Sequence, residues 1–285
     1  MNGRLAWATA RGIEGRRGVR IDRVQTFSAL LLAALCCGLP APSLAAGSPP
    51  TAYVTTVLSD GAGPYYRLGE SDGTVALDAS ALGENGTYTS GGIAYGAPSL
   101  LFADGDSSVF ADAGFGTPAG VVAPASSDPS DYSIEGWFQP VRSGSVPQAL
   151  IVRVNGDGAW TQMLTIQGGH FVHFVASPPA TEYSVRGATT IELGGTYHVV
   201  GTFTANGEMR LYVNGVEDGV AVSVGPPTHG DHWQVGLAPS ISGQQGWDNF
   251  DGLMDDIAFY GYVLTPDQIL NHYRLATGQP SVTFP

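Results

Sequence analysis

Short alternations of apolar and polar residues fill the chain from residue 65 onward and predict β-strands. A period of two is typical of strands that bury one face and expose the other. In Tyr132–Phe138 the pattern predicts Ile134 and Phe138 on one face, with Glu135 and Trp137 on the opposite face. Glycine, asparagine and aspartate separate these segments, as expected for short strands joined by tight turns.

Paired turn residues predict where the strands form hairpins. Gly168-Gly169, Asn206-Gly207 and Asn214-Gly215 each separate two apolar segments. Such dipeptides favour two-residue hairpin turns, because these turns need backbone angles that glycine and asparagine adopt easily. Residues 116–131 are rich in Gly, Pro, Ala and Ser, and we expect them to form a long connection.

One helix is predicted, close to the C terminus. Thr265 is a good N-cap, Pro266 suits the first helical position, and Gln268 completes a capping box. Gly278 is expected to end the helix. About a dozen strands and a single helix predict an all-β fold, a two-sheet antiparallel β-sandwich with one short C-terminal helix.

The first 46 residues have the pattern of an export signal. Arginines in residues 16–23 precede the apolar run Phe27–Leu39, and small residues follow at 43–46. The run is too short to span a membrane comfortably. We therefore expect a removed signal at 1–46, a linker at 47–60, one domain at 61–279 and a tail at 280–285. A secreted, extracellular protein without membrane insertion follows from this division.

Charge and cysteine content narrow the classes of partner. Both cysteines, Cys36 and Cys37, fall in the export signal, so the mature chain is expected to be free of disulfides. The full sequence has 12 Lys and Arg against 25 Asp and Glu, a net charge of −13. Cleavage after Ala46 removes six arginines and two acids and leaves about −17. This balance argues against nucleic acid as a partner and favours divalent cations.

The ordered set of segments resembles the laminin-G-like jelly rolls of the concanavalin A-like lectin/glucanase superfamily. The resemblance covers about residues 65–278 and implies a jelly-roll sandwich. Its function stays open, because this superfamily includes lectins, adhesion modules, glucanases and lyases. The segments that carry it are Tyr65–Glu70, Gly86–Tyr88, Ile134–Phe138, Tyr197–Phe203, Leu211–Gly215, Phe250–Tyr260 and Leu264–Tyr273.

The resemblance also implies a structural calcium ion (Ca2+). The matching carboxylate is Asp255, with Glu70, Asp78 and Asn85 as expected contributors. Calcium prefers six to eight oxygen ligands, so a few acids and glycine-rich turns suffice. The alternative is that Asp255 accepts backbone hydrogen bonds and Asp256 points to water.

Catalytic carboxylates are the weaker hypothesis. Glycoside hydrolysis needs two acids across the scissile bond, and the glucanases that the chain resembles carry them in a Glu-x-Asp-x-Glu strand that is not found here. Asp255 and Asp256 are adjacent, and strand alternation predicts that they point to opposite faces. A pair formed through the fold, Glu135 with Asp256, is the remaining catalytic alternative.

Aromatic residues beside polar ones are candidate sugar contacts. Trp160, Trp247 and Tyr183 lie near turns, and Asn249 follows Trp247 closely. A flat apolar ring with polar neighbours suits a sugar, because the ring stacks on the pyranose while the polar groups orient its hydroxyls. The alternative is that these rings close the ends of the sandwich.

The leading hypothesis is a secreted, non-catalytic, monomeric module that binds carbohydrate or a glycosylated surface partner. A diverged polysaccharide hydrolase or lyase and a purely structural envelope module are the alternatives.

Overall fold

The computed structural model describes residues 51–113, 117–126, 128–144, 146–177, 181–222, 224–239 and 246–281. The expected signal at 1–46 lies outside these residues. Within the described part, the chain forms two antiparallel sheets and two helices, α1 (Ala52–Ser59) and α2 (Pro266–Ala276). The predicted all-β sandwich is confirmed.

The first sheet, sheet A, lies beside the helices. Its strands run in the order β14-β13-β12-β7-β17-β5-β4, and β1 also pairs with β17. Their bounds are β1 Tyr65–Tyr66, β4 Ile93–Pro98, β5 Ser107–Ala111, β7 Tyr132–Pro140, β12 Tyr197–Phe203, β13 Met209–Val213, β14 Val216–Ala221 and β17 Gly252–Tyr260.

The second sheet, sheet B, packs against the opposite face of sheet A. Its order is β11-β10-β9-β8-β15-β6-β3-β2, and the short β16 pairs with β8 in parallel. Their bounds are β2 Val75–Ala76, β3 Gly86–Tyr88, β6 Val121–Ala125, β8 Gln148–Val154, β9 Trp160–Gln167, β10 His170–Ser177, β11 Thr181–Thr190, β15 His232–Val235 and β16 Asp248–Asn249.

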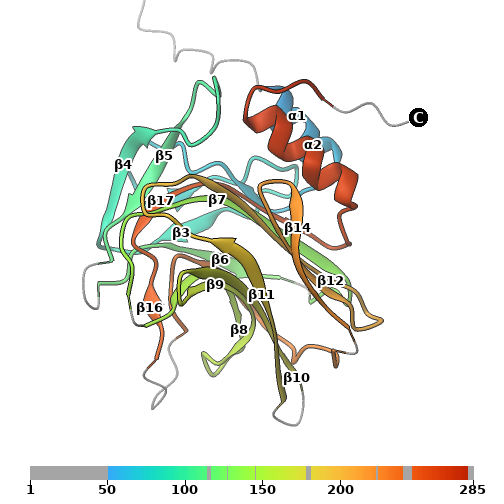
Figure 1. Ribbon diagram of the computed structural model, residues 1–285. Helices are drawn as coiled ribbons and strands as arrows, with labels where there is room; N and C mark the ends of the chain where they lie inside the picture. The colour runs from blue at the N-terminus through green and yellow to red at the C-terminus, as the bar shows by residue number, and fades with distance from the viewer. Residues whose placement is uncertain are drawn as a thin grey trace, which may run out of the picture. The chain divides into compact units, whose positions relative to one another are not determined.

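The described chain therefore stacks three layers, which are the helices, sheet A and sheet B (Figure 1). A hydrophobic core fills each of the two gaps between them. The larger core lies between the sheets and includes Ile134 and Phe138 of β7. The smaller core lies between sheet A and the helices, and it includes Trp137 of the same strand. The predicted alternation along β7 is confirmed, because successive side chains enter different cores.

The predicted hairpin turns are confirmed. Gly168 and Gly169, which join β9 to β10, have φ of 56° and 77°. Asn214 and Gly215, which join β13 to β14, have φ of 52° and 80°. Two successive positive φ values define the turn whose twist matches antiparallel strands. Asn206 and Gly207 join β12 to β13 as expected.

Two predictions about irregular regions are wrong. Residues 52–59, assigned to a linker, form α1, in which Thr51 caps the helix and Tyr53, Val54 and Val57 are buried. Its β-branched residues have low intrinsic helix propensity, so packing on sheet A decides its structure. The expected connection at 116–131 contains strand β6, which sheet B stabilises on both sides.

Helix α2 forms as predicted. The side chain of Thr265 accepts from the backbone of Gln268, and the capping box is complete. Thr277 is the C-cap, and Gly278 follows it with φ of 73°. The buried face consists of Ile269, His272 and Ala276. His272 on this face had no sequence-based explanation.

A buried polar cluster around Glu135 explains that histidine. One carboxylate oxygen of Glu135 accepts from the hydroxyls of Tyr53 (3.4 Å) and Tyr260 (3.2 Å). The other lies 3.0 Å from Nδ1 of His272, whose Nε2 lies 3.0 Å from Asp60. The cluster thus joins both helices to β7 and β17 of sheet A.

The charges in this cluster stabilise one another. Burial opposes the charge on His272, but Glu135 and Asp60 outweigh it and raise the pKa of His272 to about 9. Burial opposes the charge on Glu135 as well, but His272 and His198 lower its pKa below the ordinary value. With both ring nitrogens facing carboxylates, His272 is a cation between two anions.

We predict that His272→Gln lowers the free energy of unfolding most at about pH 5–6, by about 3–5 kcal/mol, the usual effect of breaking a buried ion pair. The His272 contribution is complete below its ordinary pKa of 6.5 and is lost as pH rises through 9. The Glu135 contribution is present above its ordinary pKa of 4.5 and is lost at lower pH. Urea unfolding at pH 5.5, 7.5 and 9.5 measures the difference.

The control is His229→Gln, because the His229 side chain is 95% exposed. It should leave stability nearly unchanged at every pH. A His272→Gln effect of equal size at all three pH values would contradict the ionic origin of the stabilisation.

Candidate ligand-binding face and candidate metal centre

Three aromatic side chains gather on the outer face of sheet B, and we name them the aromatic patch: Trp160, Phe174 and Trp247. The ring centroids of Phe174 and Trp247 are 5.6 Å apart, and Trp160 lies 6.0 Å from Phe174 and 6.5 Å from Trp247. All three pairs are edge-to-face. Trp160 is 7% exposed, whereas Phe174 and Trp247 are half-buried.

Strand register places the patch on the face turned away from the main core. Val152 of β8 pairs with Met163 of β9, which pairs with Phe174 of β10. Paired residues share a face, and this row packs with Trp160 in a hydrophobic cluster separate from the core between the sheets. Trp247 reaches the cluster from the segment that precedes β16.

Polar side chains continue the same rows to either side of the patch. Ser184 of β11 pairs with Phe174, and Gln234 of β15 pairs with Val152. His232 lies on the row of Trp160 through its pairing with Val154. Ser184 is exposed, and Gln234 and His232 are half-buried. An apolar platform with hydrogen-bonding groups at its margin can stack a sugar ring and orient its hydroxyls.

The structure thus brings together Trp160 and Trp247 from the predicted ligand residues but separates the other two. Tyr183 pairs with Val175 and packs against the core between the sheets. Asn249 accepts from the Ala238 backbone at 2.8 Å and donates to the Thr117 carbonyl at 3.1 Å, so it fixes the local chain path. Phe174 was missed, although an aromatic residue at an outward position of β10 was the available signal.

The second candidate site is built around a β-bulge in β17. The partners of β7 shift between Asp255 and Ala258, and the extra residue, Asp256, has φ of +48°. Asp255 contacts Ser99 and Leu100, and Asp256 accepts from the hydroxyl of Tyr65, a member of the core under the helices. The prediction of opposite faces is wrong, because the bulge interrupts alternation and turns both carboxylates toward the helices.

Further charges surround these two aspartates. The guanidinium of Arg67 lies 2.6 Å from Asp104, 2.9 Å from Asp106 and 3.8 Å from Asp256. Asp255 is held by the Ser99 hydroxyl at 2.9 Å and the Leu100 backbone at 2.8 Å. One arginine therefore faces several carboxylates, and the cluster is short of positive charge.

Each aspartate keeps one buried oxygen without a hydrogen-bond partner, Oδ1 in Asp255 and Oδ2 in Asp256. Burial raises the pKa of Asp255 to about 8, and the nearby charge of Asp104 adds to the rise. The hydrogen bonds from Leu100 and Ser99 lower this pKa but do not outweigh burial. Burial and the adjacent Asp255 raise the pKa of Asp256 well above its ordinary value. Either a proton or a bound cation is needed to balance these groups. The unpartnered oxygens fit a hard cation.

The other expected calcium ligands are occupied by protein donors. Glu70 accepts from the Leu77 backbone and the Tyr88 hydroxyl. Asp78 accepts from three backbone amides and one hydroxyl. Asn85 accepts from the backbone of Asp78. In the described part of the chain, no three His, Cys, Asp or Glu side chains come together in a group that could hold a metal ion.

The two carboxylates of the catalytic alternative, Glu135 and Asp256, are not exposed to solvent. Both are fully buried under the helices. Glu135 is held by His272 and two tyrosines, as described above. A polysaccharide in solvent therefore cannot reach either carboxylate in this structure.

The sequence match agrees with this architecture. A profile described as the concanavalin A-like lectin/glucanases superfamily matches residues 115–270, more than half of the chain. The chain belongs to this superfamily. The predicted resemblance is thereby confirmed. No curated protein sequence matches the chain. Across the described residues, neither helix of this laminin-G-like protein is long and apolar enough to cross a membrane.

Solved structures share the fold at low sequence identity. The binding domain of Paraclostridial Mosquitocidal Protein 1 is 12% identical with a TM-score of 0.57, over 76% of this chain and 52% of that one. The receptor-binding domain of botulinum neurotoxin type G is 12% identical with a TM-score of 0.54, and the match covers 75% of this chain and 51% of that one. Trypanosoma rangeli sialidase in complex with sialic acid is 16% identical with a TM-score of 0.54, and the match covers 75% of this chain and 33% of that one. This chain thus spans about half or less of their length, and the likeness shows the fold.

We predict that Asp255→Asn removes a loss of folding stability that the wild-type protein shows at high pH. The folded pKa of Asp255 is raised, so wild-type stability falls as pH rises from its ordinary value of 3.8 toward 8. With a chelator present, the variant should exceed wild type at pH 8 by about 1–3 kcal/mol, the usual cost of an unpartnered buried polar group. Urea unfolding at pH 4.5 and pH 8 measures this difference.

Asp72→Asn is the matched control, because Asp72 is exposed. Its stability should follow that of wild type at both pH values. If Asp255→Asn gives the same change at pH 4.5 and pH 8, the carboxylate is not titrating as described.

Proposed function

We propose that this protein is a non-catalytic module that binds carbohydrate, either free or on a glycosylated surface partner. The observation that carries the proposal is the aromatic patch on the outer face of sheet B. Half-buried Phe174 and Trp247 offer apolar area to solvent, while the nearly buried Trp160 supports them from below. A platform supported in this way loses little conformational entropy when a ligand stacks on it.

The similar structures give this proposal general support. One is a sialidase in complex with sialic acid, and two are binding domains, one of a mosquitocidal protein and one of a neurotoxin. Those properties belong to those proteins, whereas the ligand of this chain is inferred from its own aromatic patch. The expected secretion of a monomeric chain agrees with such a role and remains a prediction.

We also propose calcium as a structural ion at the bulge. Asp255 and Asp256 would each supply the oxygen that lacks a protein partner, and the ion would neutralise two carboxylates that burial otherwise keeps protonated. Both carboxylates are fully buried beneath the helices, which suits a role in holding β17 in place. The support is the unpartnered oxygens and the shortage of positive charge around them.

For the binding face, we predict that Trp247→Ala weakens glycan binding about tenfold or more, because a lost stacking platform removes about 1.4 kcal/mol or more. The half-buried ring should be removable with little loss of stability. A glycan array followed by calorimetry on the best-bound sugar provides the measurement.

Phe102→Ala is the matched control, since Phe102 is 69% exposed and lies outside the patch. It should keep wild-type affinity. If no sugar binds to the wild-type protein, the carbohydrate proposal is wrong, and the result favours the purely structural alternative. If Trp247→Ala binds like wild type, the sugar site lies elsewhere.

For the ion, we predict that calcium raises the midpoint of thermal unfolding and that a chelator reverses the rise. At a hundredfold excess over the dissociation constant, the stabilisation should be about 2.7 kcal/mol. Because the pKa of Asp255 is about 8, calcium must displace a proton and should bind more tightly at pH 8 than at pH 6. Calorimetric scans with calcium or chelator at both pH values measure this.

Asp255→Asn should abolish the response to calcium, whereas Asp78→Asn should retain it, because both oxygens of Asp78 already accept hydrogen bonds. If calcium leaves the midpoint of thermal unfolding unchanged at both pH values, the proposal of a structural calcium ion is wrong.

A further inference from the structure

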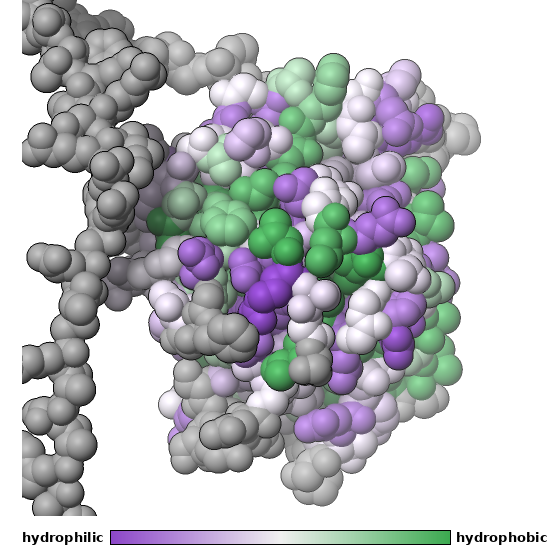
Figure 2. Space-filling view, turned by 60° about the vertical axis from the view of Figure 1, so that its left-hand side comes forward, coloured by the Kyte–Doolittle hydropathy of each residue, from purple (hydrophilic) through white to green (hydrophobic). Residues whose placement is uncertain are grey.

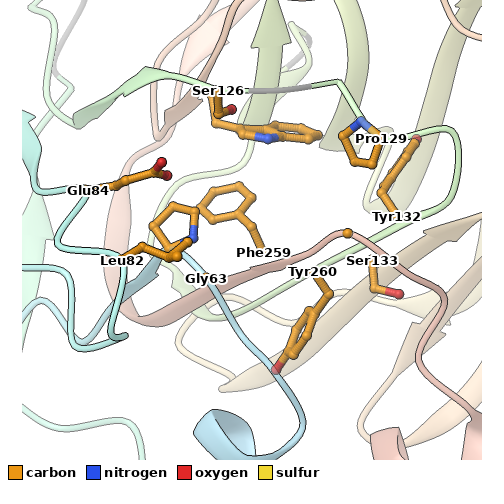
Figure 3. Close-up of a pocket in the computed structure, with 12 residues that line it drawn as sticks. Gly63, Leu82, Glu84, Ser126, Pro129, Tyr132, Ser133, Phe259 and Tyr260 are labelled. Atoms are coloured by element: carbon orange, nitrogen blue, oxygen red, sulfur yellow. The ribbon is translucent and has the colours of Figure 1, made fainter.

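A cavity, which we name the end pocket, opens where β7 begins and β17 ends. It has a volume of about 140 Å³. Its lining residues are Gly63, Pro64, Leu82, Glu84, Ser126, Pro129, Tyr132, Ser133, Trp233, Phe259, Tyr260 and Gly261. None of them belongs to the aromatic patch, so the pocket is a distinct candidate site (Figure 3).

Three aromatic rings form the inner wall of the pocket. Trp233 of β15 lies 5.2 Å from Phe259 of β17 and 6.1 Å from Tyr132 of β7, measured between ring centroids. All three are at most 5% exposed and belong to the core between the sheets. Since their positions are fixed by that core, the π faces and edges at the pocket are preorganised.

The hydroxyl groups of the lining are already engaged by the protein. Tyr132 bonds to Nε2 of His173 at 3.0 Å, Tyr260 donates to Glu135 at 3.2 Å, and Ser133 donates to the Tyr262 carbonyl at 3.0 Å. Ser126 accepts from Arg153. The described lining therefore offers a ligand few hydrogen-bond donors.

Glu84 is the exception among these satisfied polar groups. It lies between β2 and β3, it is half-buried, and its side chain enters the pocket from the side opposite Pro129 and Tyr132 (Figure 3). The hydrogen bonds found at Glu84 involve its backbone, whose carbonyl accepts from Tyr66 and whose amide donates to Asp78; none to its carboxylate is found in the described part of the chain. The pocket thus combines an unpaired anion with aromatic walls.

This combination selects against most ligand classes. An anion would meet the Glu84 carboxylate without donors to compensate. A sugar needs donors as well as acceptors for its hydroxyls, and the lining provides mainly acceptors. An organic cation needs an anion and π faces, which are present.

One positive charge lies beside the aromatic wall. The guanidinium of Arg153 lies over the Trp233 ring at 5.1 Å from its centroid, and Arg153 is not part of the lining. Asp128 pairs with Arg153 at 3.1 Å, and Arg153 also donates to the Ser126 and Gly230 carbonyls. The net charge of −13 also attracts cations to the molecule.

We propose that the end pocket binds a small organic ammonium ion, with Glu84 as its counter-ion and Trp233, Phe259 and Tyr132 as its aromatic wall. The mouth is accessible, because Leu82 at its rim is 61% exposed. On the face shown in Figure 2, apolar side chains lie among polar ones. This site is independent of the proposed sugar-binding face.

The test uses the full-length protein with choline and with 3,3-dimethylbutan-1-ol, which has the same shape without the charge. Binding is followed by NMR through the indole resonance of Trp233. Choline should bind at least about tenfold more tightly than the alcohol, the upper part of the range for a desolvated cation on aromatic rings with an added ion pair. Equal binding of the two compounds, or no binding of choline, would overturn the proposal.

Two variants localise the effect. Glu84→Gln keeps the size of the side chain and removes its charge, so choline affinity should fall about tenfold while binding of the alcohol stays unchanged. Leu82→Arg places a cation at the exposed rim. It should also weaken choline binding, because the two positive charges repel each other.

Glu192→Gln is the matched control, because it removes one exposed carboxylate between β11 and β12, outside the pocket. It should bind choline like wild type. If Glu84→Gln does so as well, or if a monosaccharide perturbs Trp233 more strongly than choline, the pocket does not recognise an ammonium ion.

Discussion

The buried charge of Glu135 is the constraint on which the three-layer arrangement depends. A carboxylate with no exposure is tolerated only when charged or hydrogen-bonding partners surround it. Here His272 comes from α2, Tyr53 comes from α1, and Tyr260 comes from β17. Asp60, which caps α1, binds the other nitrogen of His272. Helices that are separated by almost the whole domain in sequence are thus held on one face of sheet A.

With that face covered, the two candidate ligand sites are left on other parts of the sandwich. The aromatic patch lies on the outer face of sheet B, and the end pocket lies between strand ends. The same covering layer removes Glu135 and Asp256 from solvent. The helices thus determine which surfaces of the sandwich stay open to a ligand.

The bulge at Asp256 shows how one residue changes the chemistry of a strand. Regular alternation would place Asp255 and Asp256 on opposite faces, one of them in the apolar core between the sheets. The extra residue turns both toward Arg67, Asp104 and the helix side, at the cost of a left-handed backbone angle at a residue with a side chain. The result is a pair of buried oxygens without hydrogen-bond partners.

Local patterns in the sequence determined many of the strands, though not β6, and they determined the hairpin turns and α2, because alternation, Asn-Gly pairs and a capping box act over a few neighbouring residues. Trp160 and Trp247 were recognisable for the same reason, as aromatic residues beside turns. Other features depend on contacts between distant segments: α1 forms on a surface that sheet A provides, and Phe174 completes a patch through cross-strand register. The bulge at Asp256 and the pairing of Glu135 with His272 join residues that no local pattern connects. Only the tertiary structure decided these features, because their free energies come from burial and from charges brought together by folding.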